Sequence, residues 1–206
     1  MTAIIKWLMA IVLLTITTAD AQTETPRVRM ETSKGAIVIA LDPQAAPKTV
    51  ANFLAYVESG FYDNTIFHRV IKGFMIQGGG FEADMRQKRT QAAIVNEADN
   101  RLKNLAGTIA MARTSAPHSA TSQFFINTVD NAFLDFKRKT NREYGYCVFG
   151  RVVEGMEVVK AIENVATAMR GGHRDVPVEP VIIQKTALVT QQLQPSQPEE
   201  PTQKKE

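Results

Sequence analysis

The feature of this sequence that most limits its fold is a set of eight short apolar segments, which glycines and turn residues separate. None exceeds nine residues, a length that suits β-strands better than helices. Lys34-Gly35 joins the first two segments and is a hairpin signal. We therefore predict strands over residues 28–33, 36–41, 65–71, 74–78, 108–112, 123–127, 146–153 and 181–189.

Only two stretches show the apolar spacing of a helix. In residues 47–59, apolar side chains recur at i, i+3, i+4 and i+7, between a proline suited to a first turn and a glycine suited to a C-terminal cap. Residues 155–165 form a second, shorter amphipathic stretch. Many short strands with two helices predict a mostly β fold, a closed antiparallel barrel capped by two α-helices. Closure would remove the sheet edges that invite aggregation.

The two ends of the chain differ in composition from the segments between them. Residues 1–21 contain a lysine, a short apolar run and an Ala-Asp-Ala site, the pattern of a secretory signal peptide. The apolar run is shorter than the roughly 20 residues that span a bilayer, so an uncleaved anchor is the less favoured alternative. We predict a signal peptide at 1–21, a short lead at 22–27, one domain at 28–190 and a disordered polar tail at 191–206, with the mature protein exported.

Charge and cysteine content exclude several function classes. The net charge is +3, from 24 basic and 21 acidic side chains, which is too small an excess to indicate a nucleic-acid partner. Cys147 is the single cysteine, so no internal disulfide can form, and its apolar neighbours predict a buried thiol. The histidines lack metal-ligand spacing, and we predict neither a metal nor a cofactor.

The stretch FHRVIKGFMIQGGG, residues 67–80, is the strongest candidate for a binding site. Arg69 carries a permanent positive charge within an apolar segment, and burying that charge unpaired would cost several kcal/mol. We therefore place its guanidinium at the wet rim of an apolar surface, with the amide of Gln77 beside it. Three glycines then remove side chains and allow close approach. The combination predicts a groove for a peptide with one apolar anchor.

A second stretch, GTIAMARTSAPHSATSQFFIN, has the same character. Gln123 and Phe125 lie two residues apart, so in a strand both point to one face, whereas Phe124 and Ile126 point to the other. Phe133-Leu134 adds apolar surface in a later loop. The long irregular segments 81–105 and 112–122 are of a length that is usually functional.

Four segments resemble signature segments of the cyclophilins, the peptidyl-prolyl cis-trans isomerases: FHRVIKGFMIQGGGF, GTIAMAR, SQFFIN and YCVFGRVVEGMEVV. The resemblance extends from about Val28 to Val189 and is greatest to the periplasmic cyclophilins of Gram-negative bacteria. It implies an eight-stranded antiparallel barrel capped by two helices, in agreement with the strands counted above, and a periplasmic location for the mature protein.

The resemblance also implies the roles of individual residues. Arg69 would be the catalytic arginine, and Gln77 and Gln123 would hold the substrate backbone and the arginine. The proline pocket would be formed by Phe74, Met75, Phe125 and Leu134. The remaining substrate-binding positions implied are His68, Ala112, Arg113, Thr114, Phe133 and Tyr146.

Four positions depart from the pattern of many family members. Phe133 stands where many eukaryotic members have Trp, which removes an indole donor and implies weak cyclosporin binding. Tyr146 stands where those members have His. Arg113-Thr114 replaces a small Asn-Ala pair, so the resemblance does not define the sequence preference around the proline.

The implied activity is isomerisation of Xaa-Pro bonds in exported, folding polypeptides. The alternative is a proline-peptide-binding chaperone with the same groove and little turnover. A structural, envelope-associated role for the tail is a third class. The expected partners are unfolded or extended proline-containing chains, with no nucleic acid and no membrane after signal cleavage, and we expect a monomer.

Overall fold

The computed structural model describes residues 25–189, so the predicted signal peptide, most of the short lead and the polar tail lie outside the described residues. Two α-helices, ten strands and two short 3-10 helices follow one another along this part of the chain. They are β1 (Arg27–Thr32), β2 (Gly35–Leu41), α1 (Pro47–Glu58), β3 (Thr65–Ile71), β4 (Met75–Glu82), η1 (Ala98–Asn100), β5 (Thr108–Met111), β6 (Phe124–Asn127), η2 (Ala132–Leu134), β7 (Val148–Glu154), α2 (Met156–Glu163), β8 (Thr167–Arg170), β9 (His173–Pro177) and β10 (Ile182–Leu188).

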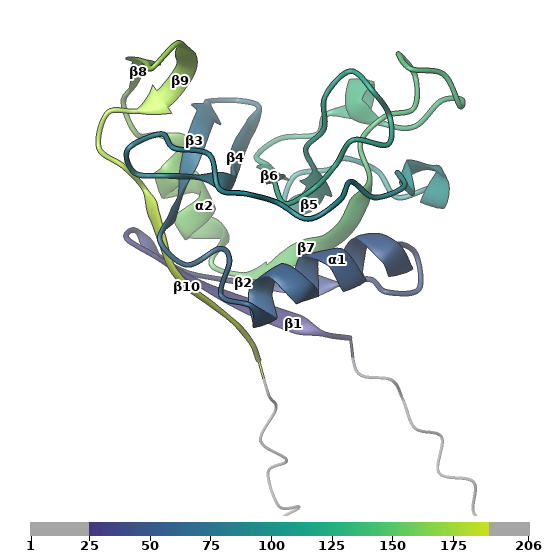
Figure 1. The fold of residues 1–206 in the computed structure, drawn as a ribbon, viewed down its shortest axis with the longest axis horizontal. Coiled ribbons are helices and arrows are strands. Elements are labelled where there is room, and N and C mark those ends of the chain that lie inside the picture. The colour runs from purple at the N-terminus through teal and green to yellow at the C-terminus, as the bar shows by residue number, and fades with distance from the viewer. Residues whose placement is uncertain (1–24, 190–206) are drawn as a thin grey trace, which may run out of the picture.

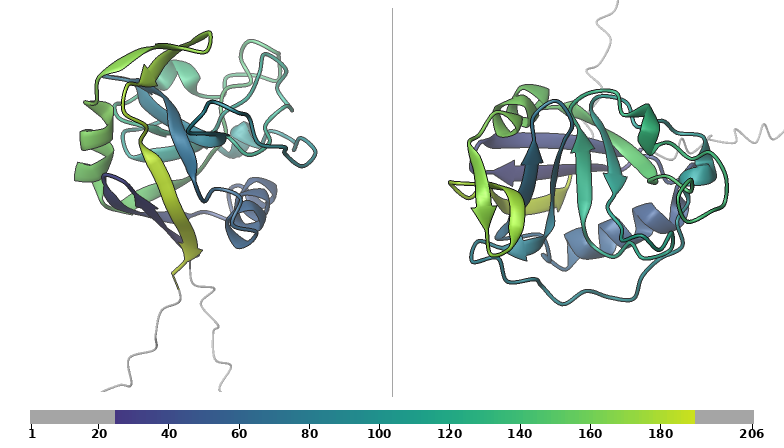
Figure 2. Two further views of the ribbon diagram at one scale, coloured as in Figure 1. Left: turned by 60° about the vertical axis from the view of Figure 1, so that its left-hand side comes forward. Right: turned by 90° about the horizontal axis from the view of Figure 1, so that it is seen from above.

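Eight of the strands close into a barrel in the order β1-β10-β3-β4-β6-β5-β7-β2, and β2 pairs with β1 to complete it. Every neighbouring pair in the barrel is antiparallel. The two α-helices lie on opposite sides of the barrel (Figures 1 and 2). The predicted fold class, a mostly β closed barrel of eight antiparallel strands capped by two helices, is confirmed.

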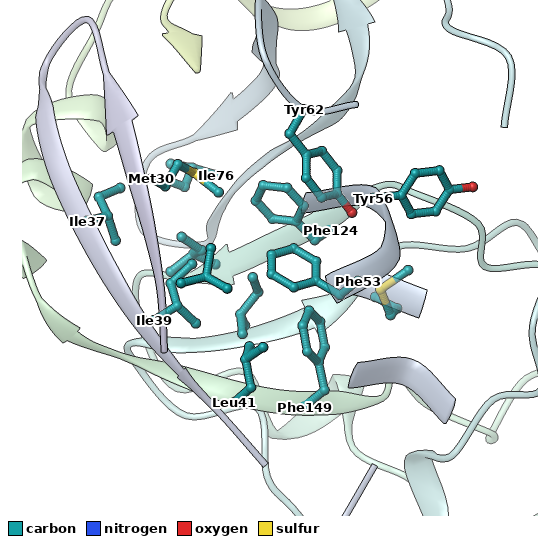
Figure 3. Packing of buried hydrophobic residues seen from close by; sticks show 14 of the residues in the cluster. Met30, Ile37, Ile39, Leu41, Phe53, Tyr56, Tyr62, Ile76, Phe124 and Phe149 are labelled. Carbon is teal, nitrogen blue, oxygen red and sulfur yellow. The ribbon is translucent and has the colours of Figure 1, made fainter. Parts of the chain in front are cut away.

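The barrel interior is filled by aromatic and branched side chains (Figure 3). Phe53 of α1 reaches into it, with its ring centroid 5.2 Å from that of Phe149 and 5.8 Å from that of Phe124 in an edge-on arrangement. Phe124 and Ile126 are fully buried here, whereas Phe125 belongs to a separate apolar cluster, as the period-two alternation of a strand predicts. Aromatic contacts and the buried faces of both helices thus stabilise the barrel core.

A carboxylate that is distant in the sequence caps the N-terminus of α1. The residue preceding the helix, Ala46, has no side chain that can accept a hydrogen bond from the first turn. Glu97, in the long loop after β4, accepts hydrogen bonds from the Lys48 and Thr49 amides at 3.1 and 2.8 Å and from the Thr49 hydroxyl at 2.8 Å. A negative charge at a helix N-terminus is favourable, so Glu97 both caps α1 and fixes the loop to it.

The glycine triplet lies inside a strand, which corrects one predicted boundary. We predicted that the fourth strand would cover residues 74–78, but β4 runs from Met75 to Glu82. A Cβ atom at Gly79 would lie 2.7 Å from the Phe124 ring and 2.8 Å from the Tyr62 ring, and one at Gly80 would lie 2.5 Å from Cγ of Gln123. Glycine is therefore required here because neighbouring side chains occupy the space that a Cβ would need.

The sequence prediction missed the two-stranded sheet of β8 and β9. This hairpin lies beyond the ends of β3 and β4 (Figure 1). Gly171 and Gly172 form its turn, and both have positive φ, as a two-residue type I′ hairpin turn requires. No helix among residues 25–189 has the length and apolar character needed to cross a membrane.

Candidate active site

The site is a cavity of about 610 Å³ on the outer surface of the barrel. It is lined by residues of β3, β4 and β6, by the loops around residues 112 and 134, and by the β8–β9 hairpin. Eleven of the thirteen residues that the sequence indicated line it: His68, Arg69, Phe74, Met75, Gln77, Ala112, Arg113, Gln123, Phe125, Leu134 and Tyr146.

The two other residues that the sequence indicated lie outside the lining. Phe133 is 68% exposed, and its ring stacks on that of Phe74 at a centroid distance of 5.6 Å, so it extends the apolar rim. Thr114 is exposed, and its amide and hydroxyl contact the hydroxyl of Ser119 at 2.9 and 2.8 Å. Phe133 is thus adjacent to the cavity, whereas the Thr114 side chain is engaged within its own loop.

An irregularity in β3 directs Arg69 into the cavity. Phe67 and Arg69 are two residues apart and would share a face in a regular strand, yet Phe67 is fully buried in the barrel core and the Arg69 side chain is 43% exposed. The pairing of β3 with β4 shifts register between these two residues. Such bulges re-aim side chains, and this one turns Arg69 out of the core while Phe67 remains inside it.

The floor of the cavity is a second apolar cluster, separate from the barrel core. Met75, Phe125 and Leu134 are buried in it, and Phe74, Ala112 and Tyr146 pack against its edge. Phe125 and Tyr146 meet edge to face, with ring centroids 5.6 Å apart. A concave apolar floor with polar groups at its margin suits a small apolar side chain whose backbone is held from the sides.

Polar side chains border this floor. Arg69 and Gln77 face each other across the β3–β4 pair. The amide of Gln77 donates to the side-chain oxygen of Gln123 at 3.0 Å, and the missing side chain of Gly80 makes room for Gln123. The guanidinium of Arg69 faces Asp175 of β9, with 3.7 Å between Nε and Oδ2. Arg69 thus has one partly exposed counter-charge and remains accessible from the cavity.

His68 lies under the site in an apolar environment. Its ring is buried, its centroid is 4.6 Å from that of Phe81, and its Nδ1 has no hydrogen-bond partner among the described residues. Burial, together with smaller electrostatic contributions from His173 and Arg69, lowers the pKa of His68 from 6.5 to about 4. The imidazole is therefore neutral at pH 7. Its role at that pH is packing rather than charge.

A buried amide network holds the two edges of the apolar floor together. Asn131 donates to the backbone oxygen of Phe74 at 3.0 Å and to the side-chain oxygen of Asn127 at 2.7 Å. The backbone N–H of Asn131 donates to the backbone oxygen of Asn104 at 2.7 Å. Because Asn131 lies in the segment that leads to Leu134, these bonds fix that segment to the backbone of Phe74 at the edge of the apolar floor. Sequence reasoning did not identify these asparagines, since a single Asn after a strand gives no signal of its tertiary partners.

Sequence reasoning also missed six residues of the lining: Phe81, Gln87, Gly172, His173, Arg174 and Asp175. Four of them lie on the β8–β9 hairpin. The Gly171-Gly172 pair was a usable hairpin signal, but the flanking segments are short and mostly exposed and have no apolar alternation. Asp175 has a positive φ of 61°, which is uncommon for a residue other than glycine.

Cys147 directly follows the lining residue Tyr146 and is buried, as the sequence predicted. Burial raises the pKa of its thiol to about 11, so it is neutral at pH 7. Among residues 25–189 there is no group of three or more His, Cys, Asp or Glu side chains arranged to hold a metal ion.

Comparison with known proteins identifies the family. The family model described as "Cyclophilin type peptidyl-prolyl cis-trans isomerase/CLD" matches residues 27–188. The chain belongs to this family. Its activity is accordingly the cis–trans isomerisation of peptidyl-prolyl bonds, and the resemblance seen in the sequence is confirmed.

Two bacterial relatives are similar over almost their whole length. The chain is 59% identical over 161 residues to peptidyl-prolyl cis-trans isomerase B of Escherichia coli, covering 78% of this chain and 98% of that protein. It is 56% identical over 171 residues to peptidyl-prolyl cis-trans isomerase A of Dickeya dadantii, covering 83% and 88%. Among solved structures, a cyclophilin-type isomerase of Cryptosporidium parvum, crystallised in the presence of the dipeptide Ala-Pro, matches with a TM-score of 0.64 and 30% identity, covering 80% of this chain and 99% of that one.

Proposed function

We propose that this cyclophilin accelerates rotation about Xaa-Pro bonds by directing the guanidinium of Arg69 at the proline nitrogen. The observation that carries the proposal is the position of Arg69 at the margin of the apolar floor formed by Met75, Phe125 and Leu134. A proline ring seated on that floor would bring its nitrogen to the rim where the guanidinium lies.

The chemistry needs only one well-placed donor. Rotation breaks amide resonance, which gives the Xaa-Pro bond a barrier of roughly 18–20 kcal/mol, and the nitrogen of the twisted amide gains a lone pair. A cation that donates to this lone pair binds the twisted amide more tightly than the planar one, and only such differential binding speeds rotation. Raising the rate from about 0.01 to about 10 per second requires roughly 4 kcal/mol, the size expected of a charged hydrogen bond in a partly desolvated site.

We assign the supporting roles to the residues around Arg69. Phe74, Met75, Phe125 and Leu134 hold the proline ring. Gln77 and Gln123 orient the substrate backbone, supported by their mutual hydrogen bond of 3.0 Å. The remaining substrate-binding positions we propose are His68, Ala112, Arg113, Thr114, Phe133 and Tyr146.

The test compares wild type with Arg69→Ala in NMR exchange measurements on short Xaa-Pro peptides. We expect the isomerisation rate to fall at least tenfold, while thermal unfolding remains cooperative. A matched variant, Arg69→Lys, keeps the charge but loses the planar fork, and we expect it to recover only part of the rate. Unchanged catalysis of a proline-limited refolding reaction by Arg69→Ala would refute the assignment.

The alternative is a proline-peptide-binding chaperone with little turnover in its natural setting. A pure binder does not need Arg69, so peptide affinity and suppression of aggregation would survive Arg69→Ala together with any biological activity. An isomerase function predicts instead that biological activity falls with the exchange rate.

We further propose that the substrates are exported, folding polypeptides and that the protein acts in the periplasm as a monomer. The apolar run and Ala-Asp-Ala site in residues 1–21 support export, with 22–27 as a lead, 28–190 as the isomerase domain and 191–206 as a polar tail. Mass spectrometry of the exported protein tests cleavage after Ala21, and deletion of 191–206 tests whether the tail contributes to activity. The phenyl ring of Phe133, which lacks an N–H donor, supports weak cyclosporin binding, which an inhibition titration would measure.

A further inference from the structure

The side chain of Arg113 is fixed on the cavity wall by contacts within the protein. Its Nε donates to the backbone oxygen of Gly145 at 2.9 Å, and its Nη1 donates to the backbone oxygen of Thr114 at 2.9 Å. The guanidinium lies over the ring of Tyr146, 4.6 Å from the centroid. Two carbonyls and one aromatic face thus orient the group before any ligand arrives, and a ligand would bind it at little cost in side-chain entropy.

Most of the hydrogen-bonding capacity of Arg113 remains available to a ligand. A guanidinium has five N–H donors, and only two have hydrogen-bond partners among residues 25–189. The three other donors suffice for a forked pair with a carboxylate. No carboxylate of the described residues lies within 4.0 Å of Arg113, whereas Arg69 faces Asp175. The charge of Arg113 is therefore uncompensated.

The cavity as a whole is also positive. Among the charged side chains that line it, three are arginines, at positions 69, 113 and 174, and Asp175 is the single carboxylate. With Asp175 closest to Arg69, the excess charge lies with Arg113 and Arg174. Anionic side chains are thereby favoured near the site, and such attraction also raises association rates.

We propose that this cleft prefers proline-containing segments that carry Asp or Glu directly before or directly after the proline, and that Arg113 recognises that carboxylate. The inference rests on the proposed function, because the apolar floor beside Arg69 must hold the proline. A cavity of about 610 Å³ measures on the order of 8 Å across, the length of two to three extended residues. An acidic neighbour of the proline can thus reach the wall while the ring is seated.

Arg113 is better suited to this role than Arg174. Arg174 is exposed on the β8–β9 hairpin and has no hydrogen bond from its side chain among the described residues. A ligand would have to order that side chain on binding, at a cost that the fixed guanidinium of Arg113 does not incur. The assignment of the carboxylate to Arg113 therefore follows from its preorganisation.

The experiment uses two pairs of short peptides, one pair with Glu or Gln directly before the proline and one with Glu or Gln directly after it. The ratio of kcat/KM for Glu over Gln is measured by NMR exchange, and the ratio of Kd by calorimetry. For wild type we expect a three- to tenfold preference for Glu in one of the two pairs at low salt, falling as ionic strength rises, as for partly exposed ion pairs. Arg113→Gln should reduce the ratio to about one, and Arg113→Lys should retain part of it.

Arg151 provides the matched control. It is exposed on β7 and lines a different groove, so Arg151→Gln makes the same change of net charge away from the cleft and should leave the Glu preference intact. If Arg113→Gln does not fold cooperatively, Arg113→Lys and the salt series carry the test.

Two results would overturn the inference. The first is the absence of a Glu preference at both positions in wild type. The second is a preference that survives Arg113→Gln, which would assign the carboxylate to another cation such as Arg174. The proposed role of Arg69 is tested separately, because Arg69→Ala should slow all four peptides alike while the Glu-to-Gln ratio of Kd persists.

Discussion

The buried histidine beneath the active site makes the stability of the domain dependent on pH. His68 is packed against Phe81, and burial, aided by electrostatic contributions from His173 and Arg69, lowers its pKa from 6.5 to about 4. In the unfolded chain the imidazole binds a proton below about pH 6.5, whereas in the folded protein it does so only below about pH 4. Between these values the unfolded state binds more protons, so the free energy of unfolding decreases as the pH falls.

The size of the effect follows from the two pKa values. A tenfold change in proton affinity corresponds to about 1.36 kcal/mol. The neutral, buried His68 therefore contributes about 3 kcal/mol to the free energy of unfolding, which is fully present above pH 6.5 and lost by about pH 4. At pH 5 the loss is about 2 kcal/mol. This is a large fraction of the stability of an ordinary domain.

The measurement is urea denaturation of wild type and His68→Gln at several pH values from 7 to 4. Glutamine does not titrate, so the effect of the substitution on the variant's own free energy of unfolding does not change with pH. The wild-type value minus the variant value should therefore decrease by about 2 kcal/mol between pH 7 and pH 5. Carboxylates that titrate in both proteins cancel in this difference. His173→Gln, whose ring is exposed on the hairpin, should retain most of the wild-type dependence. Parallel pH curves for wild type and His68→Gln would refute the reasoning.

Two further predictions concern stability. Glu97→Ala removes the remote cap of α1 and should lower the free energy of unfolding by about 1.5–2 kcal/mol, with about half that loss for Glu97→Gln, as measured by urea denaturation; a cap that contributes nothing would leave both variants equal to wild type. Gly79→Ala places a Cβ 2.7 Å from the Phe124 ring at a φ of +79° and should cost at least about 3 kcal/mol, whereas Gly73→Ala, with a φ of +71° and no atom within 4 Å of its Cβ, should cost only about 1 kcal/mol. Equal losses in the two glycine variants would show that backbone conformation alone, not the aromatic contacts, requires glycine at position 79.

The sequence was sufficient for those parts of the fold where one face of an element is buried and the other is not. The apolar spacing in α1 and the alternation at residues 123–126 gave both the elements and their inward faces. The β8–β9 hairpin escaped this reasoning because β8 is exposed along its whole length and β9 is buried only at its end. A hydrophobic pattern cannot indicate a strand that buries almost nothing, and only the Gly-Gly turn carried a signal.

The site residues also divide into those that the local sequence indicates and those whose contacts only the tertiary structure shows. The motif around Arg69 identified residues that line the cavity, but the direction in which Arg69 points depends on a bulge that only the pairing of β3 with β4 reveals. The cap at Glu97 and the amide network around Asn131 likewise join segments that are far apart in the chain, and nothing in either local sequence indicates its partner. Interactions of this kind are products of the tertiary fold.

The charge balance of the cleft is also a tertiary property, and it distinguishes Arg69 from Arg113. Asp175 reaches Arg69 from a hairpin more than a hundred residues away, whereas Arg113 is held by neutral carbonyls and an aromatic ring. A partly exposed ion pair of this kind contributes about 0.2–1 kcal/mol, so it can steady Arg69 without removing its ability to donate to a substrate. Arg113 on the cavity wall has no carboxylate among the described residues within 4.0 Å. The proposed reactivity toward the proline nitrogen and the proposed attraction for an acidic neighbour are therefore assigned to two different arginines, and substitution of one should leave the contribution of the other measurable.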